Sequence, residues 1–102
     1  MMSVVKPLKG QEEQVRALLE ELNQFAAAQA GYLEGYVFEG TDGAGAMGRV
    51  SVWDSPASAN RAAQGGRTLA LRASIQRRLE EDLVEGMYAL TASTPLPVRS
   101  AA

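Results

Sequence analysis

Apolar residues recur along this chain with two different periods, which distinguish strands from helices. In a strand, successive side chains point to opposite faces, so apolar residues alternate with a period of two. This pattern is found in residues 2–5, 32–39, 48–53 and 84–92. In a helix, apolar residues three and four positions apart form a stripe along one side. This spacing is found in residues 11–30, in residues 57–64 and in a stretch that restarts near Thr68. The predicted order is strand, helix, two strands, a helix in two pieces, and a last strand.

The first predicted helix, residues 11–30, carries its start and stop signals in the sequence. Glu12 and Glu13 fall in the first turn, where the helix dipole favours negative charge. Gly31 follows the last residue and is expected to end the helix as its C′ residue. The stripe that would be buried consists of Val15, Leu18, Leu19, Leu22, Phe25 and Ala26.

The junction between the third strand and the second helix is the best-defined point of the sequence. Val50 and Val52 alternate with more polar residues, and Trp53 ends the strand. Ser55 is a good N-cap, and Pro56 suits the first helical position because its missing N–H would have no partner there. A strand therefore runs directly into a helix that breaks at residues 65–66.

These elements predict an α+β fold, a ferredoxin-like βαββαβ sandwich with an antiparallel sheet. Right-handed crossovers are expected to place the first and last strands at the centre of the sheet and both helices on one face. The second strand is apolar on both faces, with Tyr32, Tyr36 and Phe38 on one and Leu33 and Val37 on the other. We therefore expect a second copy to cover the free face in a homodimer. Residues 1–93 form the predicted domain, and residues 94–102 a disordered tail.

The composition excludes several classes of site. The chain has 102 residues, a net charge of −2, no cysteine and no histidine. Disulfides, thiolate chemistry, a Ser-His-Asp triad and histidine or cysteine metal sites are therefore excluded, and no metal site is expected. The near-neutral charge predicts no nucleic-acid partner, and no apolar run is long enough for a signal peptide or a membrane span. The expected location is cytoplasmic.

Two further patterns favour ordinary structural explanations. Residues 43–48 match G-x-G-x-x-G, but a strand follows them rather than the helix that a dinucleotide site needs, so a flexible hairpin loop is the better interpretation. The arginines from Arg49 onward are interpreted as part of a solvated surface, with Arg67 as the one that could hold an anionic ligand; they are Arg49, Arg61, Arg67, Arg72, Arg77 and Arg78.

Several short segments resemble the antibiotic-biosynthesis-monooxygenase (ABM) group of the dimeric α+β-barrel superfamily. They are residues 5–7 before a Glu-rich helix start, residues 29–32 leading into the second strand, residues 50–55 leading into the second helix, Leu79, and residues 86–90 in the last strand. The resemblance spans residues 3–92. It implies a homodimer whose two sheets form a barrel, with a pocket in each subunit between sheet and helices. Members include cofactor-free oxygenases of aromatic polyketides, quinol oxygenases and haem-degrading enzymes.

One departure from that family changes the expected chemistry. The family often has a histidine between the two parts of the second helical region, where this chain has residues 65–68. The haem-degrading branch needs a histidine ligand and a tryptophan inside the second helix, and this chain has neither there. Haem degradation is therefore not expected, and no cofactor is implied.

The resemblance and the residue chemistry together lead to a candidate site and to three hypotheses. Asn60 and Tyr88 are the candidate catalytic residues; Trp53, Tyr36, Tyr32 and Arg67 are the candidate substrate-binding residues. The first hypothesis is a cofactor-independent monooxygenase-like protein acting on a small aromatic or phenolic substrate. The second is a non-catalytic dimeric module for ligand binding or assembly, favoured by the lack of an obvious base. The third is an anion-binding regulatory domain built on the arginines.

Overall fold

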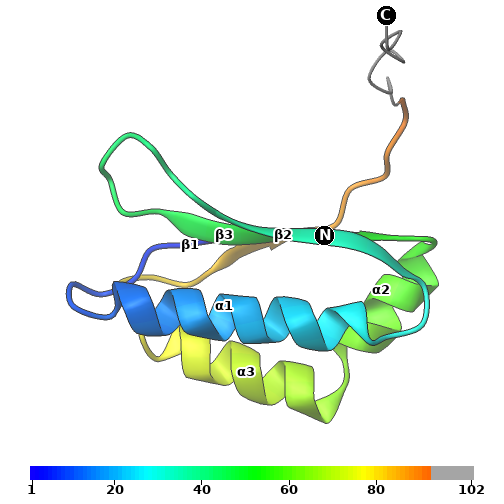
Figure 1. Ribbon diagram of the computed structural model, residues 1–102, viewed down its shortest axis with the longest axis horizontal. Helices are drawn as coiled ribbons and strands as arrows, with labels where there is room; N and C mark the ends of the chain where they lie inside the picture. Colours follow the sequence, from blue (N-terminus) through cyan, green and yellow to red (C-terminus); the bar gives the residue numbers. More distant parts are fainter. Residues whose placement is uncertain (93–102) are drawn as a thin grey trace, which may run out of the picture.

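A computed structural model describes residues 1–92 and places all three helices on one side of a single four-stranded antiparallel sheet (Figure 1). The elements are β1 (Met2–Val5), α1 (Glu12–Ala27), β2 (Tyr32–Glu39), β3 (Met47–Trp53), α2 (Pro56–Ala63), α3 (Gly66–Gln76) and β4 (Val84–Gly86). The ferredoxin-like α+β fold is confirmed. The expected tail, residues 94–102, lies outside the described residues.

The strand order β2-β3-β1-β4 corrects the expected topology. β1 and β3 are the central strands, and β4 lies at an edge, so the prediction of the first and last strands at the centre was wrong. The reason is in the connections. The hairpin holds β2 on one side of β3, while the α2–α3 crossover returns the chain to the far side of β1.

The helix ends follow the sequence signals at α2 and depart from them at α1. The Ser55 hydroxyl accepts a hydrogen bond from the Ser58 N–H at 3.2 Å, and Pro56 is the first helical residue, as predicted. α1 ends at Ala27 rather than near Ala30. Gly31 lies in the turn that follows, with φ 88°, and a Cβ there would meet the Ser58 hydroxyl at 2.3 Å. Gly31 is therefore required by the turn and by its close contact with α2, rather than as the C′ residue of α1.

The hydrophobic core lies between the helices and the inner face of the sheet. It is made of Val5 and Met47 from the sheet, Val15, Leu19 and Leu22 from α1, and Leu71, Ile75 and Leu79 from α3 and the residues after it. The predicted stripe of α1 thus packs directly onto the strands.

The outer face of the sheet is apolar and carries no helix. One row of this face runs across three strands, where Val50 of β3 pairs with Tyr36 of β2 on one side and with Met2 of β1 on the other. In the next row, the Phe38 ring lies over Gly48. Tyr36 is 57% exposed. Among residues 1–92, nothing is packed against this face in the way that the helices cover the inner one (Figure 1).

The last strand is shorter than expected. β4 stops at Gly86 instead of continuing to Ala92. Tyr88 leaves the strand and folds back, so that its hydroxyl lies 2.6 Å from where a Cβ on Gly86 would be. Leu90, further along, is 77% exposed. The apolar alternation of residues 87–92 therefore belongs to an extended segment that has no partner strand in the described chain.

Candidate functional site

The inner face of β3 changes from core to polar groups along its length. Met47 belongs to the hydrophobic core, and the next inward residues are Arg49, Ser51 and Trp53. The Arg49 side chain is a charged group in a buried position, at 7% exposure. Its Nε atom has no hydrogen-bond partner among residues 1–92. Burial lowers the pKa of Arg49 from its usual value, although nearby Tyr32 and Glu85 favour its charged form.

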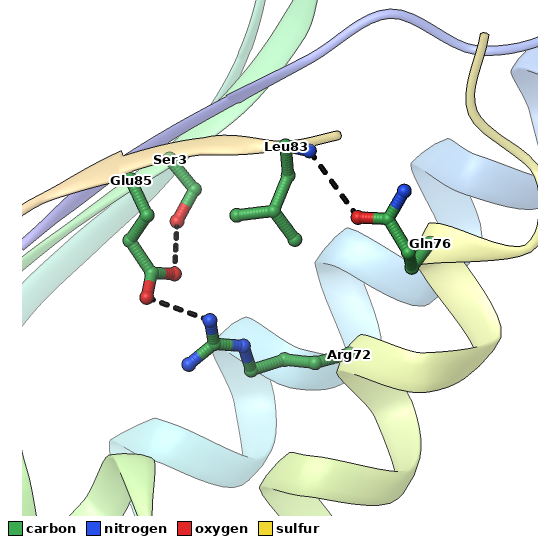
Figure 2. Close-up of polar contacts among 5 residues, drawn as sticks. All are labelled: Ser3, Arg72, Gln76, Leu83 and Glu85. Atoms are coloured by element: carbon green, nitrogen blue, oxygen red, sulfur yellow. Dashed lines mark hydrogen bonds and ion pairs between the residues drawn. The ribbon is translucent and has the colours of Figure 1, made fainter. Parts of the chain in front are cut away.

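Glu85, the carboxylate that favours the charged form of Arg49, is already engaged by other donors. Glu85 on β4 forms an ion pair with Arg72 of α3 at 2.8 Å and accepts a hydrogen bond from the Ser3 hydroxyl at 2.8 Å (Figure 2). The Leu83 N–H donates to the Gln76 side chain at 3.2 Å (Figure 2). This hydrogen bond links the residue before β4 to the last residue of α3, beside the Arg72–Glu85 pair. Arg49 is in none of the ion pairs formed by the described residues.

A β-bulge brings Tyr32 to the same side of the sheet as Trp53. The pairing register shifts between Tyr32 and Glu34, so Tyr32 pairs with Trp53. The two rings meet edge to face, with centroids 5.5 Å apart and an interplanar angle of 86°. The Trp53 indole N–H donates to the Ser51 hydroxyl at 2.9 Å. The expectation that Tyr32 shares a face with Tyr36 was therefore wrong, because strict alternation fails at a bulge.

Gly35 makes room for the Tyr32 hydroxyl beneath the sheet. A Cβ on Gly35 would lie 2.5 Å from the Tyr32 hydroxyl and 2.5 Å from Oδ1 of Asn23, which comes from α1. Asn23 Oδ1 is buried and has no hydrogen-bond partner in the described part of the chain. Two side chains with unpartnered buried atoms, Arg49 and Asn23, thus lie in the layer between sheet and helices.

A small inner cavity of about 30 Å³ opens beside Arg49. Polar groups of Arg49, Ser51, Thr68, Arg72 and Glu85 line one part of it. The apolar part is formed by Leu22, Ala26, Trp53, Ala59, Ala62 and Ala63, with Met1 at the edge. A buried water needs about 10–15 Å³ by this measure, so the cavity has room for about two waters and not for an aromatic ring.

A second and larger hollow, the outer groove, has a volume of about 720 Å³. Its walls are the outer ends of β1 and β3, the start of α2 and the segment after β4; they comprise Met1, Met2, residues 50–56, Ala59 and residues 87–90. Met1, Ser51, Trp53 and Ala59 line both hollows. The inner cavity and the outer groove therefore share a wall, and Trp53 is its aromatic member.

The structure brings together three of the six predicted site residues. Trp53 lines both hollows, Tyr32 contacts it, and Tyr88 lines the outer groove. The other three lie elsewhere. Asn60 is exposed on α2 and lines neither hollow.

Arg67 and Tyr36, like Asn60, lie outside the two hollows and have partners of their own. Arg67 is ion-paired with Glu21 at the surface. The Tyr36 hydroxyl donates to Glu34 at 3.0 Å on the outer face. That hydrogen bond raises the pKa of Tyr36 above its usual value, so its hydroxyl keeps its proton and is a poorer proton donor.

Arg49 is the residue that sequence reasoning missed. The sequence pattern groups it with the solvated arginines. The others lie on α2, on α3 and in the turn after α3, whereas Arg49 is in phase with Met47 and Ser51 in a central strand. A charged residue in phase with the buried face of a strand is the signal that could have identified it. The interpretation of Arg49 as part of a solvated surface was wrong.

The loop between β2 and β3 has the geometry expected of a hairpin connection. Gly43 and Gly45 have φ of 80° and 84° in the loop between β2 and β3, and a strand follows them, as expected for a hairpin loop. Among residues 1–92, no group of three or more carboxylates is arranged to hold a metal ion. The described helices include none that is long and apolar enough to cross a membrane.

Comparisons with known proteins support the fold. No protein-family model matches the sequence, and no curated protein matches it. Solved structures do match. A candidate antibiotic biosynthesis monooxygenase from Nitrosomonas europaea has a TM-score of 0.81 at 10% identity, over 92% of this chain and 90% of that one. Another antibiotic biosynthesis monooxygenase has a TM-score of 0.75 at 16% identity, over 87% and 95% of the two chains.

A third similar structure is SnoaB, a cofactor-independent oxygenase from Streptomyces nogalater. Its TM-score is 0.67 at 15% identity, over 89% of this chain and 95% of that one. At these identities the likeness shows a common fold, so the ferredoxin-like subunit fold expected from the ABM resemblance is confirmed.

Proposed function

We propose that this protein is a cofactor-independent monooxygenase that binds a small aromatic or phenolic substrate in the outer groove. The observation that carries the proposal is the groove itself. Its volume of about 720 Å³ falls in the range of about 300–1,000 Å³ that small-molecule sites occupy, and its lining is mostly apolar with aromatic side chains at Trp53 and Tyr88. Solved structures with the same fold include a cofactor-independent oxygenase.

In a cofactor-independent oxygenation, the protein only needs to bind the substrate and help transfer a proton. An electron-rich ring that has lost a proton reacts with dioxygen directly. In an oxygenation of a ring CH₂ group to a carbonyl, one oxygen atom enters the substrate and the other leaves as water with the two hydrogens. The protein must exclude water, orient the ring and stabilise the substrate anion. In the proposal Trp53 forms the apolar wall, and the Tyr88 hydroxyl is the polar group that exchanges a proton within the groove.

Oxygen uptake with anthrone- and hydroquinone-type substrates tests the proposal. We expect uptake by the unaltered protein and a loss of about tenfold or more in rate for Trp53→Phe, because a misplaced ring reacts far more slowly. Tyr88→Phe is expected to slow the reaction and to change its pH profile. Leu69→Ala, which truncates an apolar residue 52% exposed on α3, is the matched control and should keep full activity.

A non-catalytic ligand-binding module is the second candidate. The complete absence of histidine favours it, since no side chain of the chain has an ordinary pKa near neutrality. Measuring ligand binding and oxygen uptake with the same compounds distinguishes the two candidate functions. Binding of the same aromatic compounds without any oxygen uptake would support the module and would refute the oxygenase.

We also propose that the protein is a homodimer joined through the outer face of the sheet. Because Met2 and Val50 of this face also line the outer groove, the partner copy would cover the groove on that side and help to exclude water from it. The exposed apolar side chains of that face, among them Tyr36 and Val84, support this proposal because a monomer would leave them in water. Light scattering should report a dimer, and Val84→Glu should shift it toward monomer. Leu69→Glu, on the helical side, should leave the oligomeric state unchanged. A monomer at all working concentrations would contradict the proposal.

A further inference from the structure

We infer that the inner cavity is a binding site for a single negatively charged oxygen group, with Arg49 as the residue that selects it. The ligand class is a small aromatic compound with one anionic head, a carboxylate or a phenolate. The inference deepens the proposed function and rests on it for the placement of the aromatic body in the outer groove. The charge preference itself requires no oxygen chemistry.

The charged groups around the cavity are mostly positive. Arg49 and Arg72 contribute two positive charges, and Glu85 contributes one negative charge that Arg72 already holds at 2.8 Å. The α-amino group of Met1, which donates to the Ser51 carbonyl at 2.8 Å, adds a further positive charge when it is protonated. Arg49 is therefore a buried cation without its own counterion among the described residues. Burying a charge without a partner is costly, so an anion entering the cavity would be favoured.

The hydrogen-bonding groups at the cavity match an oxygen anion. The Nε–H of Arg49 is buried and has no acceptor within residues 1–92, and an anionic oxygen would accept from it. The Ser51 hydroxyl accepts from the Trp53 indole, which leaves its own hydrogen free to donate. Thr68, 8% exposed, contributes a second hydroxyl to the lining. All three residues line the same small cavity.

The size of the cavity limits what can enter it. About 30 Å³ accommodates a head group but no ring, whereas the adjoining outer groove is more than large enough for a ring. Ser51 and Trp53 line both volumes, so the two hollows adjoin at these residues. A ligand whose ring lies in the outer groove against Trp53 would therefore direct its charged end past this wall toward Arg49.

Binding of benzoate, compared with its neutral analogue benzamide, tests the inference. Trp53 is the only tryptophan of the chain, so its indole N–H signal in NMR titrations reports directly on the shared wall. We expect benzoate to bind at least tenfold more tightly than benzamide. 4-Nitrophenolate compared with nitrobenzene distinguishes a phenolate head from a carboxylate one.

Three variants show whether Arg49 causes the preference. Arg49→Met should abolish it, so that benzoate and benzamide bind alike, while Arg49→Lys should keep part of it. Arg61→Met removes the same charge from an exposed position on α2 and should keep the full preference. Equal binding of the two probes to the unaltered protein, no binding of benzoate, or a preference that survives Arg49→Met would each overturn the inference.

The anion-site inference and the oxygenase proposal can be refuted separately. A benzoate preference that depends on Arg49, without oxygen uptake on any substrate, would uphold the anion site and refute the oxygenase. Oxygen uptake that Arg49→Met leaves unchanged, together with equal binding of the two probes, would refute the anion site and uphold the oxygenase.

Discussion

Replacing Arg49 by methionine should stabilise the ligand-free protein, although most substitutions of buried residues destabilise. The side chain is 7% exposed, and its Nε donor has no partner in the described chain. A buried donor without a partner costs about 1–3 kcal/mol, and a buried charge adds its own desolvation. Methionine keeps most of the apolar stem of arginine, with no charge and no donor.

The expected gain in the free energy of unfolding is about 1–3 kcal/mol, because exchanging buried ionic groups for apolar ones of similar volume is often stabilising by about that amount. For a domain of this size each kcal/mol raises Tm by about 4–8 °C. Thermal unfolding followed by circular dichroism measures the shift, and urea unfolding at constant m-value checks it. The buffer should contain no carboxylate or phenolate that could occupy the inner cavity and stabilise the unaltered protein.

Arg72→Met is the matched comparison for Arg49→Met. It removes the partner of Glu85 at 2.8 Å, where the two side chains are 30% and 23% exposed, and it should lower the stability by about 1 kcal/mol. If Arg49→Met also destabilises the protein, Arg49 is a structural partner of Glu85 and not an unpaired cation. A double-mutant cycle with Glu85→Gln would then show a coupling energy between the two residues, and the reasoning would be refuted.

Three further predictions follow from single contacts. Gly35→Ala should destabilise by about 1–3 kcal/mol, because its Cβ would lie 2.5 Å from the Tyr32 hydroxyl; an unchanged Tm would mean that this space is not filled. Ser55→Ala should cost about 0.5–2 kcal/mol through loss of the α2 cap, as measured by urea unfolding, and an unchanged midpoint would contradict the cap. Glu34→Gln should lower the pKa of Tyr36 toward its usual value, since the carboxylate that disfavours the phenolate is gone. The Tyr36 titration is obtained as the ultraviolet difference from Tyr36→Phe, and an upward shift would refute the assignment.

Local signals predicted most of the elements. The stripe of α1, the Ser55 cap with Pro56 behind it, and the break at residues 65–66 each depend on neighbours within one helical turn. The hairpin between β2 and β3 is equally local. These parts of the fold were predictable because the residues that specify them are close in the chain.

The candidate site was predictable only in part. Trp53 was identified because it stands where a strand meets a capped helix. Tyr32 was placed on the wrong face because a bulge, caused by how β2 pairs with β3, interrupts the alternation. Asn60 was selected for its chemistry and its distance along α2 from Trp53, but its side chain faces solvent.

The sequence by itself determined the order of the elements, the Ser55 cap of α2 and the apolar stripe of α1, since periodicity and capping act over a few residues. Only the tertiary structure decided that β4 lies at the edge beside β1, and that its Glu85 is held by Arg72 and Ser3. The same packing buried Arg49 without an acid of its own. Burial and pairing of a charge depend on which distant segments surround it, and that information is absent from any short stretch of the chain.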